Sequence, residues 1–516
     1  MTTGSSRARR TGFSFQPLDR MALGLMALLA VLITVLLLMG STTAPRIREF
    51  TWQDAQISSA DRAFLLSFTR PMDRGSVEQG LTIEPPLPGK FSWAGRRMAY
   101  TLDDPTPYGT EFTLTLEGAR DRFSDSDEGQ AMPTFEAKFR SRDRAFVYLG
   151  VDGEEAGRLM LNNLTQQETL ALTPPDLVVM DYIPYPEGDR ILFSASDRTE
   201  LDEGTLNQKL YTVTTGIHLD TPPQTPLGQT PDTRRDRPQD AQPPGIVSLV
   251  LDSDDYQNLK FDLSADGHFL VVQRVNRSNP GDYGLWLVPE GEAAQPLDTE
   301  PGGDFLIAPD SSTLAMAQGQ GMAILPLEAS TDPLDFLPEF GMVMSFSPDG
   351  AAAAMVRFNE NPDDPTRSLF LVTNQGTEQQ LLETNGSFLS AQFDQLRSLL
   401  YVLVTQRIDA AEYVEQPYLV VVNLTTNDAK TMLKLPIQRD IQMHLSPDGL
   451  GLLFDQVIND ESANPTDDAV LRGSDGRAIA SSQLWVQPIL KDVDGSPSAI
   501  EPQPLPIAGI RPRWLP

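Results

Sequence analysis

An uninterrupted apolar run occupies residues 21–40 and contains no ionisable side chain. As a helix it would extend about 30 Å, which is the thickness of the hydrocarbon core of a bilayer. The run therefore predicts a single transmembrane helix. Residues 1–20 carry four arginines and one acid, so the positive-inside bias predicts a cytoplasmic N-terminus and an extracytoplasmic remainder.

A cleaved signal peptide is the alternative interpretation of the same run. The apolar region of a signal peptide is usually shorter, about 7 to 15 residues, and ends in small residues at the cleavage site. Here the small residues 41–44 are followed by Pro45, which is a poor first residue for cleavage. The sequence favours an uncleaved signal anchor in a bacterial inner membrane or a comparable membrane.

Short runs in which apolar and polar residues alternate fill residues 45–142. A period of two between clusters of turn residues predicts half-buried strands, with Trp93 and Phe112 in their core. About seven such runs in roughly 100 residues are typical of an immunoglobulin-like β-sandwich. The clearest runs are 64–68, 91–93 and 112–116.

The same segment resembles the bacterial Ig-like domains of surface-layer and envelope proteins. The resemblance covers nearly all of residues 45–142 and implies a spacer or adhesion module without chemistry of its own. The motifs that carry it are the stretch 68–73, Ser76-Val77, Phe91-Ser92-Trp93, Tyr108-Gly109-Thr110, Ala119-Arg120-Asp121 and the stretch 135–139.

A repeated turn organises the rest of the chain, residues 143–516. Three clear copies have the form apolar-Ser-Pro/Ala-Asp-Gly, and each lies between a short strand-like run and an apolar one. Pro, Asp and Gly suit a tight hairpin, and a spacing near 40 to 50 residues is the length of a four-stranded propeller blade. The clear copies are 263–267, 346–350 and 445–449, and weaker copies are 185–188, 307–310 and 393–395.

Two features complete the predicted propeller. The segment 145–172 supplies three strands but lacks a first strand, and residues 509–516 have the form of that missing strand. Pairing them closes the ring and hides the sheet edges, which gives seven blades, with six as the alternative. A Pro-rich insertion at about 218–246 holds few apolar side chains and is predicted to be disordered.

The repeat array resembles the TolB-like, PD40-type β-propellers of bacterial envelopes, on the Ser-Pro-Asp-Gly turns and their flanking apolar strands. This resemblance covers about 370 residues. It is specific for architecture and uninformative about activity, because propellers serve as scaffolds, receptors and enzymes alike.

Composition excludes several kinds of chemistry. There are no cysteines and three histidines, and 40 basic against 71 acidic residues give a formal charge of −31. Disulfides, thiolate metal sites and broad nucleic-acid binding are thereby excluded. Gly-x-Ser-x-Gly, P-loop and HExxH motifs are absent from the sequence. No cofactor and no metal are therefore predicted, and an acidic loop at 125–129 is interpreted as a solvated hairpin.

One pair of motifs predicts a binding site on the propeller rim opposite the Asp-Gly turns. Arg274 and Asn276 follow one turn glycine at the same offset as Arg357 and Asn359 follow another. Guanidinium and amide groups on long loops could hold a carboxylate or a sugar hydroxyl. The alternative, which the residues favour, is that these side chains bond to backbone carbonyls of their own loops.

Taken together, the patterns predict an all-β protein behind a transmembrane helix, with a β-sandwich followed by a β-propeller. The function that they favour is a non-enzymatic, membrane-anchored scaffold in cell-envelope organisation. Its expected partners are the membrane and another envelope protein, a small ligand or a glycan, and not nucleic acid. The alternative is an extracytoplasmic hydrolase or lyase that acts on glycan or peptide in the propeller channel.

Overall fold

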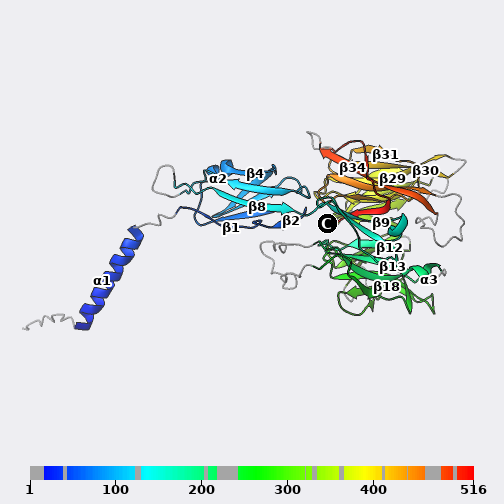
Figure 1. Ribbon diagram of the computed structural model, residues 1–516, viewed down its shortest axis with the longest axis horizontal. Helices are drawn as coiled ribbons and strands as arrows, with labels where there is room; N and C mark the ends of the chain where they lie inside the picture. The colour runs from blue at the N-terminus through cyan, green and yellow to red at the C-terminus, as the bar shows by residue number, and fades with distance from the viewer. Residues whose placement is uncertain are drawn as a thin grey trace, which may run out of the picture.

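The computed structural model describes residues 17–38, 44–122, 129–202, 207–217, 242–319, 321–327, 334–359, 365–409, 413–438, 440–459, 478–491 and 497–516. Helix α1 (Pro17–Leu38) precedes a smaller and a larger group of sheets (Figure 1). No helix in these ranges combines the length and the apolar character that a membrane crossing needs. The transmembrane helix expected over residues 21–40 is therefore not confirmed.

The smaller group consists of two four-stranded sheets that share one core. The alternating runs predicted as strands form β3, β5 and β7, so this part of the prediction is confirmed. Phe112 is buried in the core, and Trp93 packs against its edge. The first sheet has the order β1 (Ile47–Phe50), β3 (Ala63–Phe68), β6 (Arg97–Leu102), β5 (Gly89–Ala94), and the second the order β2 (Gln56–Ile57), β8 (Phe135–Ser141), β7 (Glu111–Leu116), β4 (Leu81–Glu84), with α2 (Arg74–Gly80) between β3 and β4.

The larger group is a β-propeller built from successive antiparallel sheets. In each sheet the strands lie side by side in chain order, except that the C-terminal strand β37 (Gly509–Trp514) comes before β9 (Ala145–Gly150). The first three sheets are β37, β9, β10 (Leu159–Asn163), β11 (Glu168–Ala171); β12 (Leu177–Pro184), β13 (Arg190–Asp197), β14 (Lys209–Thr214), β15 (Val247–Leu251); and β16 (Tyr256–Leu263), β17 (Phe269–Asn276), β18 (Tyr283–Pro289), β19 (Gln295–Pro296). Two short helices, η1 (Gly153–Glu155) and α3 (Arg198–Asp202), lie in the connections.

Four further sheets complete this group among the described residues. They are β20 (Phe305–Ile307), β21 (Thr313–Gln318), β22 (Gly321–Pro326), β23 (Asp335–Leu337); β24 (Met342–Phe346), β25 (Ala352–Phe358), β26 (Arg367–Thr373), β27 (Glu378–Thr384); β28 (Phe388–Phe393), β29 (Leu399–Asp409), β30 (Val414–Asn423), β31 (Ala429–Lys434); and β32 (Met443–Leu445), β33 (Gly451–Asn459), β34 (Ile479–Lys491), β35 (Pro497–Ala499), with β36 (Gln503–Pro504) also paired to β34. The predicted insertion follows β14, and its residues 218–241 lie outside the described ranges.

The C-terminal strand pairs with the beginning of the propeller, as the sequence predicted. Strand β37 is antiparallel to β9, with Gly509 opposite Gly150 and Trp514 opposite Phe146. The first strands of neighbouring sheets also contact one another, from β16 through β20, β24, β28 and β32 to β37. Buried side chains form separate clusters, most of which draw on two neighbouring sheets.

The predicted turns lie between the first and second strands of their sheets. Gly267, Gly350 and Gly449 have φ between +67° and +72°, a region that glycine enters without steric cost. Turns of neighbouring sheets also contact one another, as in the ion pair between Arg397 and Asp349 at 3.1 Å. The turns therefore share one face of the propeller, called the turn face below, and the far ends of the second strands lie on the opposite face.

Candidate functional site

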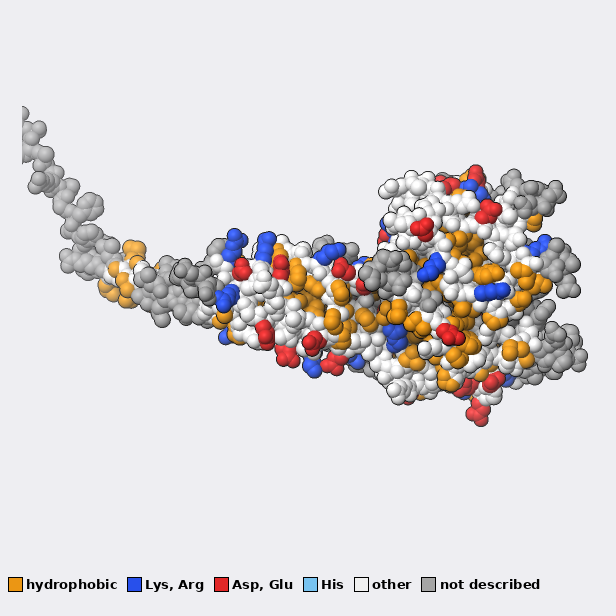
Figure 2. Space-filling view, turned by 90° about the horizontal axis from the view of Figure 1, so that it is seen from above, with side chains coloured by type: hydrophobic (Ala, Val, Ile, Leu, Met, Phe, Trp, Pro, Cys, Tyr) orange, Lys and Arg blue, Asp and Glu red, His pale blue; other side chains and the backbone are white. Residues whose placement is uncertain are grey.

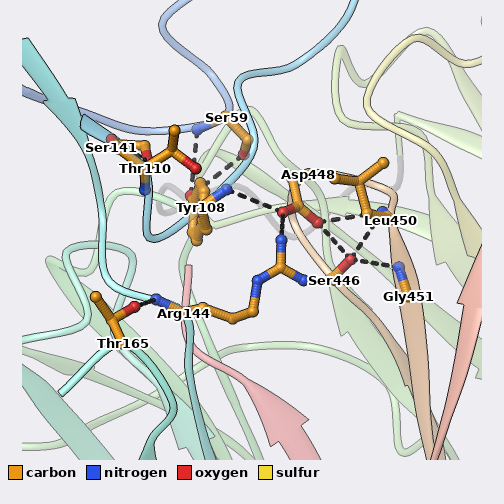
Figure 3. A network of polar contacts seen from close by, with 10 residues as sticks. All are labelled: Ser59, Tyr108, Thr110, Ser141, Arg144, Thr165, Ser446, Asp448, Leu450 and Gly451. Carbon is orange, nitrogen blue, oxygen red and sulfur yellow. Dashed lines mark hydrogen bonds and ion pairs between the residues drawn. The ribbon is translucent and has the colours of Figure 1, made fainter. Parts of the chain in front are cut away.

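The smaller group of sheets, β1 to β8, is called the sandwich below. It contacts the turn face of the propeller through a network of polar contacts (Figure 3). The Asp448 carboxylate forms an ion pair with Arg144, and it accepts a hydrogen bond from the backbone N–H of Tyr108 at 3.0 Å. The Asp448 side chain is 1 % exposed. The Tyr108 hydroxyl is in turn bonded to Ser59, whose N–H donates to it at 3.2 Å. One buried carboxylate thus joins a propeller turn to the sandwich and to the segment that connects them.

Asp448 shares its local geometry with the other turn aspartates. In all three clear turns the aspartate Oδ1 accepts a hydrogen bond from the serine two residues earlier, at 2.6 to 2.7 Å. Asp349, however, pairs with Arg397 of a neighbouring turn, and its side chain is 53 % exposed. The turn motif itself therefore stabilises only the turn. At Asp448 the second carboxylate oxygen, Oδ2, also binds the sandwich and the connecting segment.

The first strands of the sheets surround the centre of the propeller, which is called the hub below. One of them, β37, contains a register shift. Its register with β9 shifts between Ile510 and Arg513, and Arg511 has φ of +52°, which is unusual for a residue other than glycine. Asp455 accepts the backbone N–H groups of Arg511 and Gln442, each at 2.7 Å. Burial raises the pKa of Asp455 to about 7, although these two hydrogen bonds oppose the shift.

Two further titratable groups near the hub also bond to backbone. Asp262 accepts the N–H of Ile307 on the next sheet at 2.8 Å, and burial raises its pKa to about 6. His444 Nδ1 accepts the N–H of Trp514 at 3.2 Å. Burial lowers the pKa of His444 to about 3, with the charge of Arg513 adding to the effect. Asp262 and His444 thus each link the first strands of two neighbouring sheets. These links give both side chains a structural role.

A cavity of about 440 Å³ opens where the sandwich meets the hub, and it is called the hub cavity below. Its lining includes Ser59 and Tyr108 of the sandwich, and His444, Arg513 and Trp514 of the first strands. Arg142, from the connecting segment, also lines it. The volume lies within the range of small-molecule sites. This cavity, formed jointly by both domains, is the candidate ligand site.

The sequence placed the candidate site elsewhere, beginning with Arg274 and Asn276. Arg274 is 5 % exposed, and its guanidinium lies over the rings of Tyr256 and Trp286, 5.0 Å from each centroid. It donates to Asn258 Oδ1 at 3.0 Å. Asn276 accepts two N–H groups of its own loop and donates to Asp282 at 3.0 Å. These contacts lie within one sheet and its loops.

Arg357 and Asn359, the second predicted pair, also contact nearby residues of the propeller. Arg357 forms ion pairs with Glu339 and Glu378, both at 2.7 Å, and lies over the rings of Phe340 and Phe370. Asn359 donates to Thr366 at 3.0 Å. The structure shows no contact between this pair and the Arg274 pair among the described residues, so it does not bring the two motifs together. Ligand binding by these four residues stays a prediction.

Other residues considered for chemistry are dispersed. Within the described ranges, no group of three or more His, Asp or Glu side chains is arranged to hold a metal ion. His268 lies 4.0 Å from Glu290. Four sets of residues lie outside the described ranges: His218, the acidic positions 125 and 127, the two aspartates at 363–364 and the two at 467–468.

Sequence reasoning did not identify the residues that join the two domains. The sequence places Asp448 in a turn and indicates no role for Arg144 or Asp455. The signal is weak, because the turn containing Asp448 has the same sequence pattern as the exposed turn containing Asp349. Trp514, by contrast, belongs to the predicted closing strand.

Comparison with known proteins identifies no family. No protein-family model and no curated protein matches the chain. Solved structures similar to it include TolB from Acinetobacter baumannii, with 9 % identity, TM-score 0.39 and coverage of 85 % of this chain and 83 % of that one. Oligogalacturonate lyase from Vibrio parahaemolyticus has 13 % identity, TM-score 0.40 and coverage of 65 % and 89 %. A 6-phosphogluconolactonase-like protein from Bacteroides uniformis has 10 % identity, TM-score 0.38 and coverage of 72 % and 99 %. At this level of similarity they do not identify a function.

Proposed function

We propose that this chain is an extracytoplasmic binding scaffold, held at a membrane by residues 21–40, in which an Ig-like sandwich presents a seven-bladed propeller to a partner protein of the cell envelope. The membrane attachment rests on the apolar sequence alone. The observation that carries the binding proposal is the seating of the sandwich on the turn face through Asp448. That seating leaves the opposite propeller face as the open surface.

Large apolar side chains are exposed on that opposite face. Phe358, Ile408 and Ile458 lie at the ends of second strands in three successive sheets, with 44 %, 54 % and 65 % of their surface exposed. Tyr413 and Ile437, in connections on the same face, are also more than half exposed. Apolar side chains gathered on one face are typical of a protein–protein interface.

Arginine accompanies these aromatic side chains. Arg367 lies 5.7 Å from the ring centroid of Phe358, and Arg407 lies 5.3 Å from that of Tyr413. Tyr and Arg are enriched among the residues that contribute most to protein interfaces. A partner surface with an apolar centre and carboxylates around it would complement this set. Seen from above the view of Figure 1, the surface also shows apolar side chains between charged ones (Figure 2).

The hub groups support a scaffold over the enzymatic alternative. An enzyme needs an acid, a base or a nucleophile directed at a substrate. Asp262, His444 and Asp455 instead bond to backbone N–H groups of adjacent strands. Their shifted pKa values have a structural explanation in burial.

Affinity capture with the full chain tests the interaction surface. Ile408→Glu and Ile458→Glu together place two charges on the exposed face, and we expect them to abolish recovery of a crosslinked envelope partner. The matched control is Leu249→Glu on the outer strand β15, which is 57 % exposed and lies away from the proposed surface. Equal recovery with wild type and the double variant would contradict the proposed surface.

Membrane attachment needs a separate test. Fractionation of cells that express the full chain should place it with membranes, resistant to extraction by salt and alkali. A chain that lacks residues 21–40 should be released. Extraction of the full chain by alkali alone would show that this segment does not span a bilayer.

A further inference from the structure

The hub cavity is lined by positive charge in a strongly acidic protein. Among the described residues, Arg142 and Arg513 line it, and no Asp or Glu does. The Arg142 guanidinium already donates to the backbone oxygens of Pro186 and Pro516, at 3.2 and 2.8 Å, so Arg513 is the cation that faces a ligand. The whole chain carries 71 acidic and 40 basic residues. The charge of the cavity lining therefore differs from that of the chain as a whole. A ligand with a negative group would be favoured here over a neutral or cationic one.

Arg513 is only partly engaged by the described residues. Its Nη2 forms an ion pair with Asp181 Oδ1 at 3.7 Å, which is longer than a hydrogen bond. Its guanidinium lies 5.4 Å from the ring centroid of Tyr182, so an aromatic face supports it from one side. A guanidinium held in this way presents a planar fork of N–H groups, which matches the two oxygens of a carboxylate.

Trp514 supplies an aromatic wall. Its side chain lines the hub cavity and is 3 % exposed. Its indole Nε1 has no hydrogen-bond partner among the described residues and is shielded from solvent. A ligand in the cavity would therefore pack against the ring and would not reach this N–H.

His444 is also fixed as a donor at the cavity. Its Nδ1 accepts the N–H of Trp514, so the proton of the neutral imidazole is on Nε2. One acceptor of the lining is already bonded, because Gln392 Oε1 accepts the N–H of Leu445 at 2.7 Å. Pro184, Phe393 and Pro447 supply apolar walls. The cavity therefore combines donors with an apolar lining.

We infer that the hub cavity binds a small carboxylate with an apolar body, whose carboxylate lies against Arg513 and accepts from His444 Nε2. The ligand is enclosed by the sandwich on one side and by the first strands of the propeller on the other. This inference is independent of the partner surface proposed on the opposite face, so either can fail alone.

Calorimetric titration of the full chain tests the inference with phenylacetate and phenylacetamide as probes. These molecules have nearly the same shape and differ in charge. We expect phenylacetate to bind about 10- to 100-fold more tightly, the range for a charged hydrogen bond. Equal affinity of the two probes, or no detectable binding of either at 10 mM (about 10 times the weakest useful affinity), would overturn the inference.

Variants then assign the site. Arg513→Gln should remove the preference for phenylacetate, whereas Arg397→Gln, on a nearby turn and outside the cavity lining, should leave it unchanged. Trp514→Phe should weaken phenylacetate without changing its advantage over phenylacetamide. Inorganic phosphate is the probe for a simple anion site, and binding as tight as that of phenylacetate would refute the requirement for an apolar body.

Discussion

Replacing Asp448 with alanine should release the sandwich from the propeller without unfolding either domain. The variant loses the ion pair with Arg144 and the hydrogen bond from the Tyr108 N–H. Removing one partner of a buried pair costs about 3 to 5 kcal/mol. Arg144 is 26 % exposed, so water compensates in part, and a value of about 3 kcal/mol for domain opening is expected.

Hydrogen exchange at the Tyr108 amide measures this opening directly, because that amide donates to Asp448. A loss of about 3 kcal/mol corresponds to roughly 100-fold faster exchange in Asp448→Ala. The matched control is Asp349→Ala, which removes the same turn contact with serine but only an exposed ion pair. Unchanged exchange at Tyr108 in Asp448→Ala, or equal acceleration in both variants, would refute the assignment of Asp448 as the joint.

Three further predictions concern stability. Burial raises the pKa of Asp455 to about 7 from 3.8, so the folded state retains a proton that the unfolded state has released. Stability should then fall as pH rises through this window, by at most about 1.4 kcal/mol per pH unit, and Asp455→Asn should flatten the slope in urea titrations between pH 4 and 7. The pKa of His444 is lowered to about 3 from 6.5, so its stabilising contribution is lost as pH falls through that range, and His444→Gln should reduce acid sensitivity in the same assay, with an unchanged profile counting against burial as the cause. Arg274→Ala should cost about 2 to 3 kcal/mol because it removes the hydrogen bond to Asn258 Oδ1 and the cation between two aromatic faces, and Arg274→Lys should recover little of the melting temperature, since an ammonium does not stack as a guanidinium does.

Features encoded by neighbouring residues could be predicted from the sequence. The Asp-Gly turns could be located because Gly267, Gly350 and Gly449 must adopt positive φ within a four- or five-residue pattern. The closing strand could be located because residues 509–516 have the form of a first strand, which the segment 145–172 lacks. The signal for each turn lies in a few neighbouring residues. The partner of the closing strand follows because the first blade has one strand too few.

Contacts between distant residues could not be predicted in the same way. Tyr108 and Asp448 are 340 positions apart, and no feature of the turn distinguishes Asp448 from Asp349. The motif at Arg274 indicated a cation near the rim, but the rings of Tyr256 and Trp286, which enclose it, come from other strands. Sequence spacing gives the strand and the offset, whereas tertiary packing decides whether a side chain is available to a ligand.

The pairing of β37 with β9 has a consequence for synthesis of the protein on the ribosome. Strand β9 emerges more than 350 residues before its partner, so its hydrogen-bonding edge stays uncovered during translation of the intervening sheets. The sandwich, whose strands all precede Ala145, can fold early and shield part of the nascent chain. Premature termination before Gly509 would leave that edge permanently open, and such fragments should be prone to self-association and proteolysis.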